Sequence, residues 1–140
     1  MVAAGQPLVP SPPGQGSQSP GYFSFDDRAA GLVVSGWFEP DQAFKGMDAF
    51  WGGERRGLAT NGIQIQDVVM GKTGSWQTVL YDMLVPGGRS SNMRAESVRA
   101  GTWIDLHLSV TTRHSEADNR ETLQKSLDAI RVDERPAAAN

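Results

Sequence analysis

The sequence predicts an α+β domain in which an antiparallel sheet of about six strands carries two helices packed on one face. The first observation is the stretch 101–112, where apolar residues fall on every second position from Ile104 to Val110, so an extended backbone places them on one side. The second is that four strand-like runs follow one another between residues 63 and 112, which favours antiparallel neighbours. The third is a stretch of helical periodicity on either side of these runs. The predicted order is two strands, a helix, four strands and a helix.

The first two strands are predicted at 22–26 and 32–38, which are rich in aromatic and β-branched residues and are separated by a turn-forming segment. Pro40 ends the second strand, and Asp41 is expected to cap the helix that follows. One apolar stripe marks that helix: Phe44, Met47, Phe50, Trp51 and Leu58. The chain therefore starts its folded part as a hairpin followed by a helix.

The next four strands are predicted at 63–70, 76–85, 92–98 and 101–112. The run 76–85 is apolar on both sides, so Trp76 is assigned to neither face. The run 92–98 is more polar and is expected at or near an edge of the sheet.

The last helix is predicted to begin near Ser115, where the sequence fits a loose capping box. Leu123, Leu127 and Ile130 line one side of it. This helix is expected to lie across the covered face of the sheet.

Residues 1–21 carry no charge and are rich in proline, glycine, serine and glutamine, which predicts a disordered, partly polyproline arm. The single α+β domain is predicted at 22–133, and residues 134–140 are expected to be frayed. Residues 2–5 are small, like those that remain around a signal-peptidase cut. We therefore expect a periplasmic protein, with a cytoplasmic one as the alternative.

Composition excludes several classes of function. The net charge of -3 is small and its acidic and basic residues are well mixed, which disfavours a nucleic-acid partner. The chain contains no cysteine, so disulfide frameworks, thiolate metal sites and cysteine nucleophiles are excluded. No apolar run approaches the roughly 20 residues that cross a bilayer, so membrane insertion is not expected. We expect a monomer with neither a cofactor nor a metal.

Trp37, Trp103, Asp105 and His107 are the predicted binding residues. Each is out of phase with the aliphatic residues of its strand, so each is expected on an open face of the sheet. Exposed aromatic side chains beside polar ones form the kind of surface that binds peptides, sugars or a partner protein. The alternative prediction is that the loop after Pro86, or the N-terminal arm, folds over these residues and covers them. The sequence thus predicts a non-enzymatic accessory domain that binds an unidentified protein or small ligand through its open sheet face or loops.

A hydrolase-like enzyme is the rival hypothesis. Asp105 and His107 project from the same side of a strand about 7 Å apart, and a carboxylate near an imidazole can orient it as a general base. Against this, the sequence contains no serine in the pattern of a nucleophile elbow. His114 lies seven positions from His107, which disfavours a metal site shared by the two. A third hypothesis is an immunity- or inhibitor-type protein that blocks a site on another protein.

Two segments carry a resemblance to a known family. They are 31–38, Gly-Leu-Val-Val-Ser-Gly-Trp-Phe, ahead of the first helix, and 101–109, Gly-Thr-Trp-Ile-Asp-Leu-His-Leu-Ser, ahead of the last helix, which ends at 127–132. With this element order the chain resembles the PsbP-like fold of the photosystem protein PsbP and of small exported bacterial proteins of the DcrB type. The resemblance implies accessory or binding work in an exported compartment and carries no active site over to any residue here. The long uncharged arm departs from the family.

Overall fold

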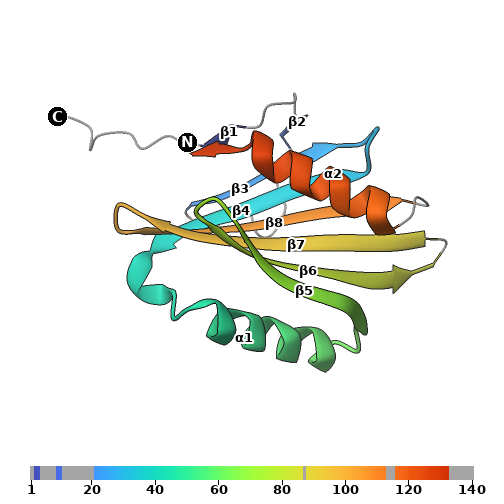
Figure 1. Cartoon of the computed structure of the whole chain (residues 1–140), viewed down its shortest axis with the longest axis horizontal. Helices are drawn as coiled ribbons and strands as arrows, with labels where there is room; N and C mark the ends of the chain where they lie inside the picture. The colour runs from blue at the N-terminus through green and yellow to red at the C-terminus, as the bar shows by residue number, and fades with distance from the viewer. Residues whose placement is uncertain (1, 4–8, 11–20, 87, 113–115, 133–140) are drawn as a thin grey trace.

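The computed structural model of the chain describes residues 2–3, 9–10, 21–86, 88–112 and 116–132 (Figure 1). Its strands are β1 (Val2–Ala3), β2 (Val9–Pro10), β3 (Tyr22–Asp27), β4 (Leu32–Pro40), β5 (Ile65–Thr73), β6 (Trp76–Val85), β7 (Gly88–Arg99), β8 (Thr102–Thr112) and β9 (Arg131–Val132). Its helices are a 3-10 turn, η2 (Asp41–Ala43), and the α-helices α1 (Met47–Thr60) and α2 (Glu116–Ala129).

The sheet is antiparallel throughout, with the order β2-β3-β4-β8-β7-β6-β5. Six strands of this sheet are long, and the two-residue β2 lies beside β3 at one edge. These observations confirm the predicted α+β class, and β8 lies centrally, between β4 and β7.

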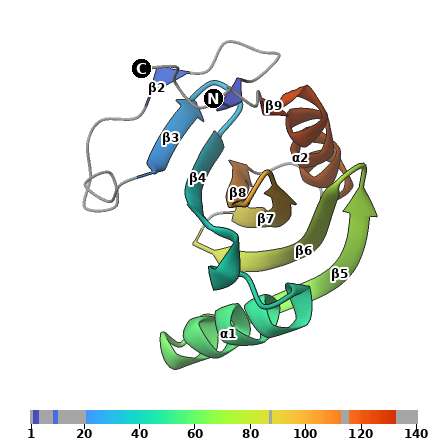
Figure 2. The same ribbon diagram turned by 90° about the vertical axis from the view of Figure 1, so that its left-hand side faces the viewer.

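The two helices lie on opposite faces of the sheet, so the prediction that both pack on one face is wrong (Figures 1 and 2). On one face, α2 covers a core that includes Leu106, Leu108 and Met93. On the other face, α1 covers a second core around Val79 and Tyr81 of β6. The chain leaves the sheet at β4 and returns at the far edge as β5, and α1 makes that crossing on the face opposite α2.

The start of α1 differs from the prediction. Asp41 opens η2 instead of capping the helix, and its backbone N–H donates to the carbonyl of Gly101 at 3.0 Å. The α-helix begins at Met47 after Gly46, which has a φ of 100° and makes no side-chain cap. Left-handed backbone of this kind is open to glycine and strained for other residues, so Gly46 sets the direction in which α1 leaves the sheet.

The polar strand β7 is not near an edge, because it lies between β8 and β6. Most of its side chains are buried. The prediction of an edge strand at 92–98 is therefore wrong, and the polar residues of β7 are interior groups that need partners.

The predicted arm is described only in part. Val2–Ala3 pairs with Arg131–Val132, and Val9–Pro10 pairs with Asp26 and Phe25 of β3. The rest of the arm, the frayed end predicted at 134–140, the capping residue Ser115 and His114 lie outside the described residues.

Candidate functional site

The four predicted binding residues do lie on one face of the sheet, but that face is not open. Trp37 on β4 is the cross-strand partner of Asp105 on β8, and Trp103 and His107 flank Asp105 on the same side of β8. This is the face on which α1 packs. Trp103 and Asp105 are 8% and 7% exposed, so the predicted open face is wrong for these two residues, whereas Trp37 and His107 are half-buried.

Trp103 belongs to the packing between the sheet and α1. Its ring lies 5.2 Å from that of Phe44 and 5.9 Å from that of Phe50, the latter in an edge-on arrangement. Its indole Nε1–H donates to Glu96 Oε2 at 2.9 Å. Trp103 therefore stabilises the packing of α1 on the sheet, and its side chain is not available to contact a ligand.

Arg94 of β7 is the centre of the polar cluster beneath α1. Its Nη2 donates to both carboxylate oxygens of Asp105, at 2.7 and 2.9 Å. Its Nη1 donates to Glu54 of α1 at 3.2 Å. The guanidinium carbon lies 5.7 Å from the ring centre of Trp37 and 5.0 Å from that of Phe50. A single cation therefore joins three strands and a helix through charge and through two aromatic faces.

Glu96 and Asp105 form a buried pair of acids. They are direct cross-strand partners, and Glu96 is fully buried. Burial, together with the hydrogen bond and charge of Asp105, raises the pKa of Glu96 to about 10, against the opposing effects of Arg94 and Trp103. Glu96 is therefore protonated at neutral pH, and Asp105 holds the charge that pairs with Arg94.

His107 and Asp105 do not form the dyad that a hydrolase would need. The ring nitrogen Nε2 of His107 lies 2.9 Å from Asn92 Oδ1, and both oxygens of Asp105 are held by Arg94. Burial and the charge of Arg94 lower the pKa of His107 to about 3. The imidazole is thus neutral at physiological pH and has an amide as its described partner.

Arg94, Glu96 and Asn92 were missed by the sequence prediction because their strand was assigned to an edge. The sequence holds a signal for them in Ala100 and Gly101, the two turn residues between β7 and β8, which both have positive φ in the structure. A two-residue turn fixes which residues face each other in a hairpin. Counting outward from it pairs Glu96 with Asp105 and Arg94 with His107, as the structure does.

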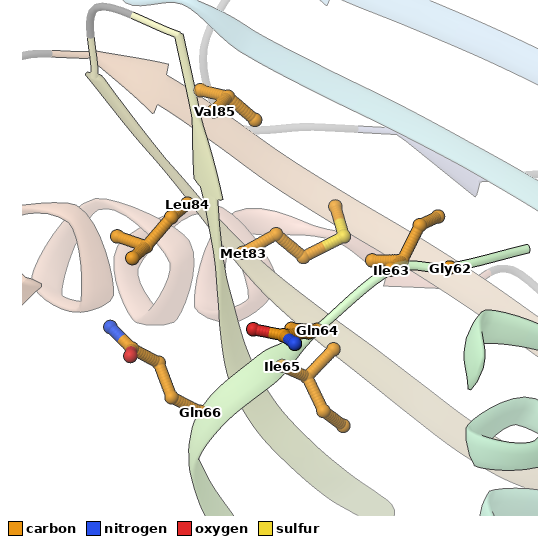
Figure 3. A pocket seen from close by; sticks show the side chains of 8 residues that line it. All are labelled: Gly62, Ile63, Gln64, Ile65, Gln66, Met83, Leu84 and Val85. Carbon is orange, nitrogen blue, oxygen red and sulfur yellow. The ribbon is translucent and has the colours of Figure 1, made fainter.

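A second feature is a hollow of about 500 Å³ where β6 ends and β5 begins (Figure 3). It is lined by Gly62, Ile63, Gln64, Ile65, Gln66, Met83, Leu84 and Val85. The lining combines aliphatic side chains with two side-chain amides, a mixture typical of small binding pockets. None of these residues was predicted as a site residue.

Exposed apolar side chains surround this hollow and continue along β5. Leu84 is 68% exposed, and Ile63, Val69 and Met70 are also exposed. β5 is the last strand of its sheet, and within the described part of the chain no strand pairs with its outer side. Unpaired backbone groups on an edge strand can pair with another chain.

A network of ion pairs anchors α2 to the other face of the sheet. The fully buried Asp82 accepts from Arg89 at 2.6 Å and lies 3.7 Å from Arg120 of α2. Asp67 and Glu116 bring their carboxylates close to that of Asp82. Because two arginines offset most of the charge of three acids, this cluster is accounted for as an internal network.

No protein-family model matches the chain, and no curated protein is significantly similar to it. None of the described helices is long and apolar enough to cross a membrane.

Proposed function

We propose that this chain is an exported accessory domain that binds an extended segment of a partner polypeptide at the hollow and along β5. The observation that carries the proposal is the position of the hollow at the free edge of the sheet, bordered by exposed apolar side chains. Export and the PsbP-like fold are parts of this proposal that rest on the sequence pattern.

An extended peptide fits these features better than a compact ligand does. Peptides that add a strand to a sheet edge gain affinity from main-chain hydrogen bonds and specificity from pockets that take alternate side chains. The edge of β5 offers the first, and the hollow beside Ile63 and Leu84 offers the second. The amides of Gln64 and Gln66 add donors and acceptors at the entrance.

The experiment is selection of binders from a random library of unstructured peptides against the whole chain. We expect the selected peptides to share an apolar anchor residue and to shift the amide resonances of β5 and of the lining residues. Leu84→Ser and Ile63→Ser should each weaken such a peptide about tenfold, since each removes an apolar contact in the pocket.

Val33→Ser is the matched control, because Val33 is a similarly exposed aliphatic residue on β4, away from the hollow. It should leave affinity unchanged. The proposal fails if no peptide is enriched, if enriched peptides bind Leu84→Ser as well as the unmodified chain, or if sedimentation shows that a second copy of the chain occupies β5.

A further inference from the structure

A bulge sets the part of β5 that can pair regularly with another strand. The pairing of β5 with β6 shifts register between Gln66 and Val69, and Asp67 in between has a φ of 56°. Such a bulge bends its strand and interrupts the regular ladder of hydrogen bonds. From Val69 to Thr73 the pairing with β6 is regular again. A partner strand therefore finds its regular edge at residues 69–73.

Lys72 lies in this regular stretch and faces the same side of the sheet as Met70. Met70 is the cross-strand partner of Val79, which belongs to the core beneath α1. Lys72 lies two positions further on, opposite Gln77, so the alternation of a strand places its side chain on the same side. Met70 is 45% exposed, and Lys72 is exposed as well. The α1 side of this edge thus offers an apolar side chain and an amine next to each other.

The charge of Lys72 is not offset by the chain itself. Among the described residues Lys72 forms no ion pair, and its neighbour across the strand pair is the uncharged Gln77. The acid on the same strand, Asp67, lies 3.7 Å from Arg89 in the network that anchors α2. A strand added to the outer side of β5 would place one of its side chains about 5 Å from that of Lys72. Opposite charges in such a cross-strand pair are stabilising, and like charges are destabilising.

A lysine at this position also discriminates between partners. Lysine on an edge strand opposes pairing with other chains, because a strand that covers its amine with an apolar or basic residue leaves the charge without a partner. A strand with an acid at that place meets no such penalty. Specificity of this kind combines one attractive contact with a cost for every wrong partner.

We propose that the peptide bound along β5 carries an acidic residue, aspartate or glutamate, that lies opposite Lys72. This inference rests on the function proposed above and names the charge that its partner must carry. Gln66, which lines the hollow, and Lys72 are separated by about 20 Å of extended chain. The acid of the peptide therefore lies roughly six residues from the apolar anchor that fills the hollow.

The test selects peptides from one random library against three forms of the whole chain: unmodified, Lys72→Glu and Lys72→Gln. The unmodified chain should enrich aspartate or glutamate at a fixed distance from the apolar anchor. Lys72→Glu should enrich lysine or arginine at that same position, and Lys72→Gln should enrich neither charge. Replacing the acid of a selected peptide by lysine should weaken binding to the unmodified chain about tenfold and strengthen binding to Lys72→Glu.

Lys45→Glu is the matched control, because Lys45 is an exposed lysine ahead of α1 and outside β5. It changes the net charge by the same amount as Lys72→Glu and should enrich the same acidic peptides as the unmodified chain.

The inference is overturned if Lys72→Glu enriches the same charges as the unmodified chain, if Lys45→Glu changes them equally, or if Lys72→Gln binds the acidic peptide as tightly as the unmodified chain does. Its failure can be told apart from that of the proposed function. Peptides that show no charge preference at this position but still lose affinity in Leu84→Ser would end this inference alone. Absence of any enriched peptide would end both.

Discussion

Glu96 is the residue whose chemistry depends most on its surroundings. It lies in the interior of the sheet, opposite a second acid and beside one arginine that the second acid already holds. A protonated carboxyl is the form that fits, because it has a hydrogen to give to Asp105 and an oxygen to accept from Trp103. Folding therefore retains a proton that the unfolded chain releases at neutral pH.

Stability should consequently fall as pH rises. The pKa of Glu96 is about 10 in the folded chain against a usual value of 4.5, so between these values the folded state holds more protons than the unfolded state. Between about pH 3 and 6.5 the unfolded chain binds a proton at His107 that the folded chain does not, because the pKa of His107 is lowered to about 3, and this opposes the effect of Glu96. Above about pH 7 the free energy of unfolding decreases with pH, by at most about 1.4 kcal/mol per pH unit. In Glu96→Gln the amide supplies the same donor and acceptor without titrating. We expect urea unfolding to show a much flatter pH dependence for this variant above about pH 7, where His107 is neutral in both the folded and the unfolded chain.

A second variant controls for the loss of a carboxylate that is not buried. Glu121→Gln removes an exposed carboxylate on α2 and should keep the full pH dependence of the unmodified chain. Equal slopes for Glu96→Gln and the unmodified chain would show that Glu96 does not hold this proton.

Among the elements, α1 combines strong anchor residues with a weak backbone. Met47 and Trp51 are its buried residues, and the Trp51 ring lies 5.1 Å from that of Tyr81. Its glycines lower the intrinsic helix propensity in the middle and in the last turns. Tertiary contacts at a few positions therefore hold a helix that its own sequence supports poorly.

Gly57→Ala should stabilise the protein. Gly57 is exposed and a Cβ there meets no atom within 4 Å, so alanine adds helix propensity and reduces the freedom of the unfolded chain. We expect a gain of about 1 kcal/mol in the free energy of unfolding, measured by urea denaturation.

Gly36→Ala provides the opposite case. A Cβ at Gly36 would lie 2.5 Å from Cζ of Phe23 and 2.9 Å from Cδ2 of Leu106, so this substitution should destabilise the protein. If Gly57→Ala instead lowered the free energy of unfolding, the conclusion that a Cβ at residue 57 meets no neighbouring atom would be wrong.

The existence and type of the long elements could be predicted from the sequence, because periodicity is a local property. The boundary of α1 could not, since Asp41 opens η2 and donates to the carbonyl of Gly101 on a distant turn, and the helix begins only after Gly46. The interior position of β7 was missed for a related reason. Polarity usually indicates an edge, and here it reflects charged groups that satisfy each other inside the sheet.

At the scale of the whole molecule, the sheet separates two cores of different kinds. The α2 side is mainly aliphatic, whereas the α1 side combines aromatic residues with the cluster around Arg94. The strand β6 contributes to both, with Val79 and Tyr81 on the α1 side and Leu80 against the α2 side. Its apolar character on both sides was the sequence signal that both faces are covered. The prediction of a single covered face rests on the polar side of β8, which in the structure is covered by α1 as well.

This division predicts unequal local stability. Native-state hydrogen exchange should show the amides of α1 opening at a lower free energy than those of β7, β8 and α2, because α1 has fewer buried residues and a weaker backbone. Gly57→Ala should raise protection in α1 selectively. Uniform protection across both helices, with or without this substitution, would show that the molecule opens as a single unit.

The pairing of β1 with β9 has a consequence for how the domain can be held. Val2–Ala3 and Arg131–Val132 are neighbours on the α2 side (Figures 1 and 2). The hollow is lined in part by residues 62–66, which follow the C-terminal end of α1. Anything fused ahead of Val2 or behind Val132 therefore departs from one common corner. A tether at either position would hold the domain at the corner beside α2, on the other side of the molecule from the described residues that line the hollow (Figure 1).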